Sequence, residues 1–150
     1  MIQLEKLKRN IPYIISLLFV LLFVHAASSK LMDYQQFKVQ LGQSPILTVY
    51  AGTVSWIVPL IELVLSFLLL FESYRLYALY TCLGLMTLFT TYIALMLNFS
   101  DSLPCSCGGV IAALGWKGHL YFNIFLMALA LFGIFFANEK QKYHTYKNTT

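Results

Sequence analysis

The sequence has few charged residues. Ten Lys and Arg together with six Asp and Glu make up only 11% of its 150 residues, whereas hydrophobic residues make up 59% and the mean hydropathy is +0.73. In soluble domains about 25% of the residues are charged. The low charge therefore excludes a large soluble catalytic domain and a disordered chain, and the apolar runs that fill more than half of the sequence exclude a disulfide-rich secreted domain. The chain is expected to lie in a membrane.

Four apolar runs divide the sequence, at residues 11–27, 46–71, 76–97 and 120–137. Each is near or above the length of about 20 residues that a helix needs to cross the hydrocarbon core of a bilayer. The first run is short and follows basic residues, so a cleavable signal peptide is the alternative to a span there. We predict a single all-α domain over residues 1–150, an integral membrane four-helix bundle.

The basic residues indicate how the spans are oriented. With four spans, both termini and the turn at 72–75 share one side of the membrane. That side carries Lys6, Lys8, Arg9, Arg75, Lys140, Lys142 and Lys147, and the other side carries Lys30, Lys38 and Lys117. The positive-inside rule then predicts a multi-pass protein of the bacterial inner membrane with both termini in the cytoplasm. Because the basic residues form no patch, nucleic-acid binding is not expected.

A short amphipathic outer helix is predicted between the first and second runs. Apolar and aromatic residues recur there at helical spacing, namely Leu31, Tyr34, Phe37 and Leu41. Asp33 and Gln36 are placed as a capping pair, and Gly42 is placed as a stop. The helix is expected on the outer leaflet, where it either covers the mouth of the bundle or binds a partner.

Small and polar residues form a stripe at helical spacing on each of the two middle runs. The first stripe is Thr48, Gly52, Ser55, Pro59, Glu62 and Ser66, and the second is Tyr80, Gly84, Thr87, Thr91, Ala94 and Asn98. Such stripes let helices pack closely in a bilayer. The prediction is that both stripes are packing faces, and the alternative is that they line a path for a ligand.

Glu62 is the one acidic residue inside the apolar runs. A carboxylate inside a span costs about 3 kcal/mol on insertion scales, so Glu62 is expected to face the interior. Tyr80 and Thr87 on the next run are its expected partners, together with a backbone carbonyl freed by Pro59. Its expected role is either structural or part of a quinone or proton site.

Cys105 and Cys107 lie in the run PCSCGG, in the second outer loop. Three interpretations are open for this pair. A structural disulfide so short in sequence would remove little entropy from the unfolded chain. An outer-face metal site would complete a four-ligand set with His25 and His119. The preferred interpretation is thiol–disulfide exchange, because a small strained disulfide is readily reduced. Cys82, alone within the third run, is expected to be a buried and inert thiol.

For thiol–disulfide exchange, His119 is placed to stabilise a thiolate and Asn123, one turn further along, is placed to orient the imidazole. The sequence contains no second outward pair of cysteines. Turnover therefore requires an electron acceptor, either a thioredoxin-like redox partner protein or a quinone bound in the bundle. The alternative function is a non-enzymatic membrane scaffold subunit, in which the loops dock a partner and the cysteines take no part in chemistry.

Three segments together resemble the methylamine utilisation protein MauE family, which is related to the DoxX-like membrane proteins. They are residues 26–45 (AASSKLMDYQQFKVQLGQSP), the second run with Pro59 and Glu62, and PCSCGG followed by WKGHLYFN at 116–123. The resemblance implies a four-helix membrane protein associated with methylamine metabolism and with maturation of an exported dehydrogenase subunit. It also implies that Cys105 and Cys107 are the redox pair. Members outside that pathway leave the substrate open.

Overall fold

The computed structural model describes residues 2–44, 47–99 and 109–149. Within these ranges the chain forms helices and no strands: α1 (Ile2–Met32), α2 (Tyr34–Gly42), the short 3₁₀ helix η1 (Thr48–Tyr50), α3 (Ala51–Leu70), α4 (Arg75–Phe99) and α5 (Gly109–Thr149). The segments Asn10–Met32, Thr48–Leu70, Arg75–Phe99 and Gly115–Glu139 are long and apolar enough to cross a membrane. The all-α class and the four spans are therefore confirmed.

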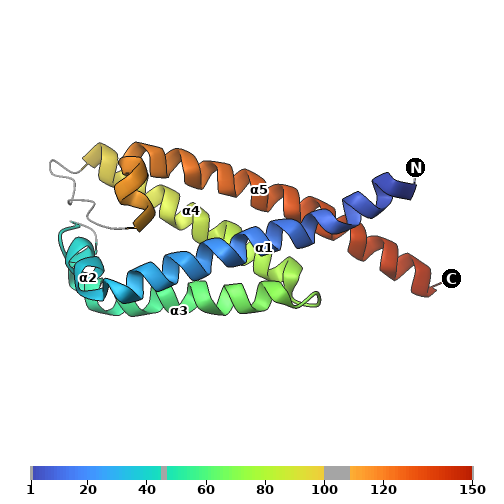
Figure 1. Ribbon diagram of the computed structural model, residues 1–150, viewed down its shortest axis with the longest axis horizontal. Helices are drawn as coiled ribbons and strands as arrows, with labels where there is room; N and C mark the ends of the chain where they lie inside the picture. Colours follow the sequence, from blue (N-terminus) through green and yellow to red (C-terminus); the bar gives the residue numbers. More distant parts are fainter. Residues whose placement is uncertain (1, 45–46, 100–108, 150) are drawn as a thin grey trace.

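The four long helices form a closed bundle in which every helix lies antiparallel to its neighbours (Figure 1). Helix α1 packs against α3 and α5, and α4 packs against α5 and α3. Both termini and the turn between α3 and α4 lie at one end of the bundle, which we call the termini end. Helix α2 lies at the opposite end, the α2 end. Short connections between antiparallel neighbours are typical of an up-down-up-down bundle.

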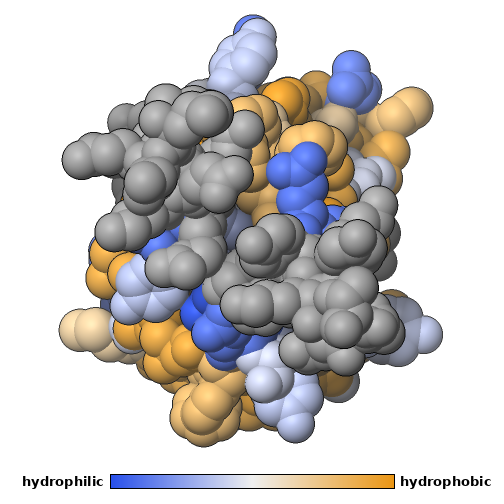
Figure 2. All heavy atoms as spheres, turned by 90° about the vertical axis from the view of Figure 1, so that its right-hand side faces the viewer, coloured by the Kyte–Doolittle hydropathy of each residue, from blue (hydrophilic) through white to orange (hydrophobic). Residues whose placement is uncertain are grey.

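The outer surface of the bundle is apolar on every spanning helix, as Leu21, Leu60, Leu88 and Phe125 show. Figure 2, which views the termini end, shows such hydrophobic residues around the sides of the molecule. A helix that exposes apolar side chains while its backbone is internally hydrogen-bonded is stable in lipid and not in water. The protein is thus a multi-pass membrane protein surrounded by a bilayer.

The spans differ from the predicted boundaries mainly in the first helix, which ends later than predicted, and in the last, which begins at Gly115 rather than at residue 120. We expected its span to end at residue 27, but the helix continues to Met32. The prediction was too short because Ser28, Ser29 and Lys30 were assigned to a loop for their polarity. In the structure, the ammonium group of Lys30 is paired inside the bundle, so the helix continues through it.

The short helix predicted between the first and second spans is confirmed as α2, with Gly42 as its last residue. Its apolar side is turned to α3: the rings of Tyr34 and Trp56 lie 5.1 Å apart, and Leu41 is buried. The predicted capping role of Asp33 is wrong, since its side chain makes no capping hydrogen bond. Packing against α3, rather than a cap, holds this short helix in place.

The main apolar core occupies the half of the bundle toward the termini end. It contains buried residues of all four spanning helices: Ile15, Phe19, Phe23, Leu65, Leu69, Ala78, Leu79, Cys82, Leu85, Met86, Leu126, Ala130 and Ile134. Helices α1 and α5 approach closely at Gly133, where an added Cβ would lie 3.1 Å from Cγ2 of Ile15. Small residues permit such close packing between helices in a membrane.

The two predicted stripes differ in outcome. On α3 the stripe faces the interior, since Ser55, Pro59, Glu62 and Ser66 are all buried. On α4 the prediction of a packing face is wrong, because Tyr80, Gly84, Thr87, Thr91 and Asn98 are exposed. The hydroxyl groups of Thr87 and Thr91 donate to the carbonyl oxygens of Leu83 and Thr87, one turn earlier. Their polar groups are thereby satisfied within α4 and need no partner helix.

Candidate functional site

A buried ion pair joins α1 to α3. Nζ of Lys30 lies 2.8 Å from Oε1 of Glu62, and the two side chains are 23% and 1% exposed. Nζ also lies 3.4 Å from the carbonyl oxygen of Ala26. A carboxylate in a membrane interior is costly unless it is paired, so Lys30 is what makes the charge of Glu62 tolerable there. The expectation that Glu62 faces the interior is confirmed.

The predicted partners of Glu62 were wrong. Tyr80 is 50% exposed, and its hydroxyl accepts a hydrogen bond from Nδ2 of Asn138. Thr87 is exposed and donates within its own helix. Both residues lie on the outward face of α4, so neither reaches the carboxylate. The sequence analysis missed Lys30 because it assigned this residue to a loop, although Lys30 is the basic residue closest in sequence to the end of the first apolar run.

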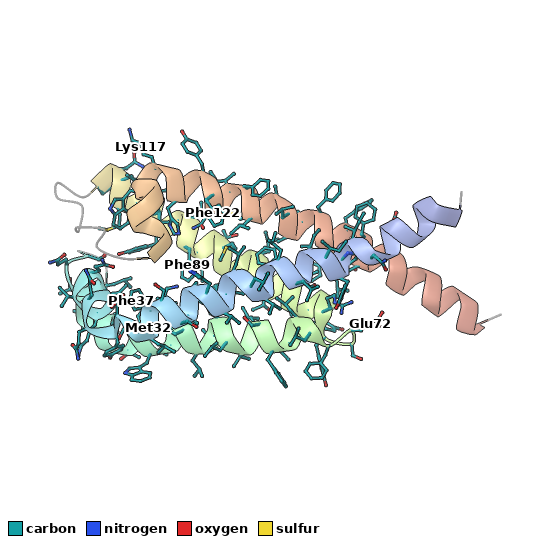
Figure 3. All side chains as sticks on the ribbon, viewed as in Figure 1. Met32, Phe37, Glu72, Phe89, Lys117 and Phe122 are labelled. Carbon is teal, nitrogen blue, oxygen red and sulfur yellow. The ribbon has the colours of Figure 1, made fainter. Side chains whose placement is uncertain are left out.

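Aromatic rings surround the ammonium group. Nζ of Lys30 lies 5.9 Å from the ring centroid of Phe37 on α2 and 5.9 Å from that of Phe89 on α4. Figure 3 labels both rings in the half of the bundle nearer α2. Each distance is within the range for an attractive cation–π interaction. Side chains from α1, α2, α3 and α4 therefore converge on one charge.

Helix α5 contributes two polar side chains, His119 and Asn123, which lie one helical turn apart. Asn123 is buried at 3% exposure, and Nδ1 of His119 is buried as well. Because they are four residues apart, His119 and Asn123 lie on the same face of α5. We call Lys30, Glu62, His119 and Asn123 the polar cluster.

Three buried polar atoms of this cluster lack a hydrogen-bond partner among the described residues. They are Oε2 of Glu62, Nδ1 of His119 and Nδ2 of Asn123. Buried polar groups in native proteins are nearly always hydrogen-bonded, and an unpaired one costs about 1–3 kcal/mol. An unpaired acceptor on α3 and an unpaired amide donor on α5, both buried in the bundle, are groups that a polar molecule could satisfy.

A second polar contact closes the cluster toward the α2 end. The hydroxyl groups of Ser55 and Tyr34 are hydrogen-bonded to each other at 3.1 Å, and Oγ of Ser55 also donates to the carbonyl oxygen of Gly52 at 2.8 Å. This contact ties α2 to the polar stripe of α3. Helix α2 is thus held over the same half of the bundle that contains the polar cluster.

The predicted cysteine pair, Cys105 and Cys107, lies outside the described residues. Cys82 is a free thiol buried in the apolar core, as expected. Of the two histidines considered for a metal site, His25 is exposed. Within residues 2–44, 47–99 and 109–149, no group of three or more His, Cys, Asp or Glu side chains is placed to hold a metal ion.

Comparison with known proteins identifies the family. The family model described as methylamine utilisation protein MauE matches residues 8–136, which include all four long apolar segments except the last residues of α5. No curated protein and no solved structure matches the chain. The match confirms the resemblance seen in the sequence. With four membrane-spanning helices and a family match over most of its length, the chain belongs to the MauE family of membrane proteins, which is linked to methylamine utilisation.

Proposed function

We propose that this protein takes part in thiol–disulfide exchange with exported proteins, through Cys105 and Cys107. The observation that supports the proposal is the polar cluster with its three unpaired atoms, in the half of the bundle nearer α2. In the sequence, Cys105 and Cys107 stand four and two residues before the first residue of α5, the helix that contributes His119 and Asn123. A redox-active pair needs groups that hold or move protons, and Glu62 and His119 of the cluster are groups of that kind.

The exchange transfers two electrons and two protons from the exported protein to the cysteine pair. Two thiols of the exported protein lose two electrons and two protons and form a disulfide, while the Cys105–Cys107 disulfide is reduced to two thiols. For another turnover, the two electrons and two protons must then pass to an acceptor. A thioredoxin-like protein that brings its own disulfide, or a quinone that is reduced to a hydroquinone, satisfies this requirement.

The proposal requires that the cysteines face outward from the bacterial inner membrane and that both termini lie in the cytoplasm. Seven of the ten Lys and Arg precede or follow the spans on the side of the termini. Of the three on the other side, Lys30 is paired with Glu62, which leaves Lys38 and Lys117 as unburied charges there. On the side of the termini Arg75 is buried as well, so six basic residues remain there against two, and the difference of four is the same as in the sequence.

Reporter fusions at the C-terminus test this orientation. We expect green fluorescent protein fused after Thr150 to fluoresce and alkaline phosphatase fused there to be inactive. An active phosphatase would place the termini in the periplasm and the cysteines in the cytoplasm. That result would overturn the proposal, because cytoplasmic disulfides are kept reduced.

Alkylation in native membranes tests the chemistry. Cys82→Ala removes the third thiol, so that a maleimide of high mass reports only on the pair. We expect two labels after treatment with a reductant and none after treatment with an oxidant. Adding Cys105→Ser and Cys107→Ser is the matched control, which takes no label in either state. Equal labelling under both conditions would show that the pair does not cycle.

Client oxidation separates the proposal from the scaffold alternative. In cells that carry Cys105→Ser and Cys107→Ser, we expect disulfide formation in exported partner proteins to be lost while the membrane protein still accumulates. Unchanged maturation of those partners would favour a scaffold without chemistry.

A further inference from the structure

We infer that the polar cluster binds the ring of a lipid-soluble quinone between α3 and α5. The inference deepens the proposed function by naming its electron acceptor, and it rests on that function only for the direction of electron flow. Binding itself depends on Lys30, Glu62, His119 and Asn123, none of which is a cysteine.

The unpaired atoms define what the ligand must offer. Nδ2 of Asn123 is a donor and needs an acceptor, such as a carbonyl oxygen. Oε2 of Glu62, whose other oxygen holds Lys30, accepts and needs a donor, such as a hydroxyl. Nδ1 of His119 accepts or donates according to its tautomer. A molecule with oxygens that accept when oxidised and donate when reduced fits this set in both states.

The surroundings of the cluster favour a flat aromatic ligand. The rings of Phe37 and Phe89 lie on two different helices, at equal distances from Lys30. Figure 3 labels both rings in the half of the bundle nearer α2. Aromatic side chains pack well against another ring, whereas they offer little to a small solvated ion.

Charge argues against an ionic ligand. The ion pair between Lys30 and Glu62 has no net charge, and Glu62 is 1% exposed. A cation would have to displace the ammonium group of Lys30 from Oε1, at 2.8 Å. An anion would have to leave water and lie beside an unpaired carboxylate oxygen. A neutral ligand avoids both costs, and one that reaches a site inside a membrane bundle must be lipid-soluble.

Reduction at this site balances without a further reactant. The two thiols of Cys105 and Cys107 are oxidised to a disulfide and release two electrons and two protons. The quinone takes up both and becomes a hydroquinone, whose new hydroxyl group donates to Oε2 of Glu62.

Fluorescence quenching tests binding directly. The chain has two tryptophans: Trp56, whose ring packs at a tilt against that of Tyr34, and Trp116, which lies three residues before His119. The full chain in lipid nanodiscs would be titrated with decylubiquinone and, separately, with a menaquinone. We expect saturable quenching by one or both, and Asn123→Leu should weaken it about tenfold, since it removes one hydrogen bond from a buried site.

Two control variants accompany the titration. Asn98→Leu makes the same change on the outer face of α4, where Nδ2 donates to the carbonyl oxygen of Ala94, and should bind as the wild type does. His119→Phe is a second variant of the cluster, for use if Asn123→Leu fails to fold, and should also weaken binding. Thermal unfolding of each variant confirms that it is folded.

The possible outcomes are distinct. Equal quenching in Asn123→Leu and Asn98→Leu would place the quinone elsewhere in the bilayer and overturn the inference, as would quenching that does not saturate. If neither quinone binds, the inference is wrong, and water rather than a ligand satisfies the unpaired atoms. The variant with Cys105→Ser and Cys107→Ser should bind the quinone as the wild type does. Loss of client oxidation in that variant supports the proposed function whether or not a quinone binds.

Discussion

The interiors of the two halves of the bundle differ in polarity. Toward the termini end, the interior is filled with apolar side chains such as Phe19, Leu79 and Ala130, each fully buried. Nearer α2, the interior holds buried apolar residues such as Ile93 and Met96, and also an ion pair and unpaired atoms of Glu62, His119 and Asn123 that have no partner among the described residues. The first half is packed for stability, whereas the second half retains unsatisfied groups that cost stability. Such a local cost is typical of a binding site.

The largest expected effect comes from breaking the ion pair. Lys30→Met leaves the carboxylate of Glu62 buried without its partner and should destabilise the protein by about 3–5 kcal/mol. The double variant Lys30→Met with Glu62→Leu should recover most of that loss, because it removes both charges. Thermal unfolding in detergent measures both. Lys38→Met, an exposed lysine on α2, is the control and should change little. A double variant as unstable as the single one would contradict this account.

Overpacking the apolar half should have the next largest effect. Gly133→Leu places a side chain where a Cβ alone would approach Cγ2 of Ile15 to 3.1 Å. The expected loss is about 1–3 kcal/mol, as for other overpacked cores. Gly84→Leu is the matched control, since nothing lies within 4 Å of a Cβ added there, and it should be neutral or slightly stabilising. Similar losses at both glycines would show that the close approach of α1 and α5 is unimportant.

The polar half should respond in the opposite direction. Asn123→Leu replaces an amide whose Nδ2 is unpaired with an apolar group of similar size. We expect the free energy of unfolding in the absence of quinone to rise by about 1–2 kcal/mol, because the cost of the unpaired group is removed. Chemical or thermal unfolding measures this change. A marked destabilisation would mean that Asn123 has a structural role rather than a binding role.

The smallest effect should appear where α2 meets α3. Tyr34→Phe removes the 3.1 Å hydrogen bond with Ser55 and retains the ring that packs against Trp56. The expected loss is about 1 kcal/mol, the usual net value of one hydrogen bond. Tyr77→Phe, at an exposed position on α4, should have no effect. Comparing the unfolding temperatures of the two variants tests whether this bond fastens α2 to the bundle.

Hydropathy and spacing predicted what depends on one helix alone. The number of spans, the short helix that ends at Gly42, and the buried position of Glu62 all follow from such local patterns. The pairing of Lys30 with Glu62 did not follow. Lys30 and Glu62 are 32 residues apart in sequence, and their pairing depends on how α1 and α3 are rotated toward each other. A hydropathy count also treats every lysine as a solvated charge, although a long side chain can carry its ammonium group into the bundle.

The outward stripe of α4 shows a second limit of sequence patterns. Spacing identifies Thr87 and Thr91 as one face of a helix, but it does not say whether that face needs a partner. Both hydroxyls are satisfied by carbonyl oxygens of their own helix, so the face is compatible with lipid. The inward face of α4 carries larger side chains instead, among them Leu79 and Met86, because these bury more apolar surface. The site residues Cys105 and Cys107 remain predictions.

Helix α5 changes direction at a single glycine. Gly115 has φ 66° and ψ 172°, so the helical path changes direction there, between residues 109–114 and the spanning part of the helix. Any residue with a Cβ would be strained in that conformation. Two torsion angles at a single glycine set the angle between the short first part of α5 and the part that holds His119. Gly115 therefore sets the direction in which residues 109–114 leave the spanning part of the helix, and a side chain at this position would change that direction.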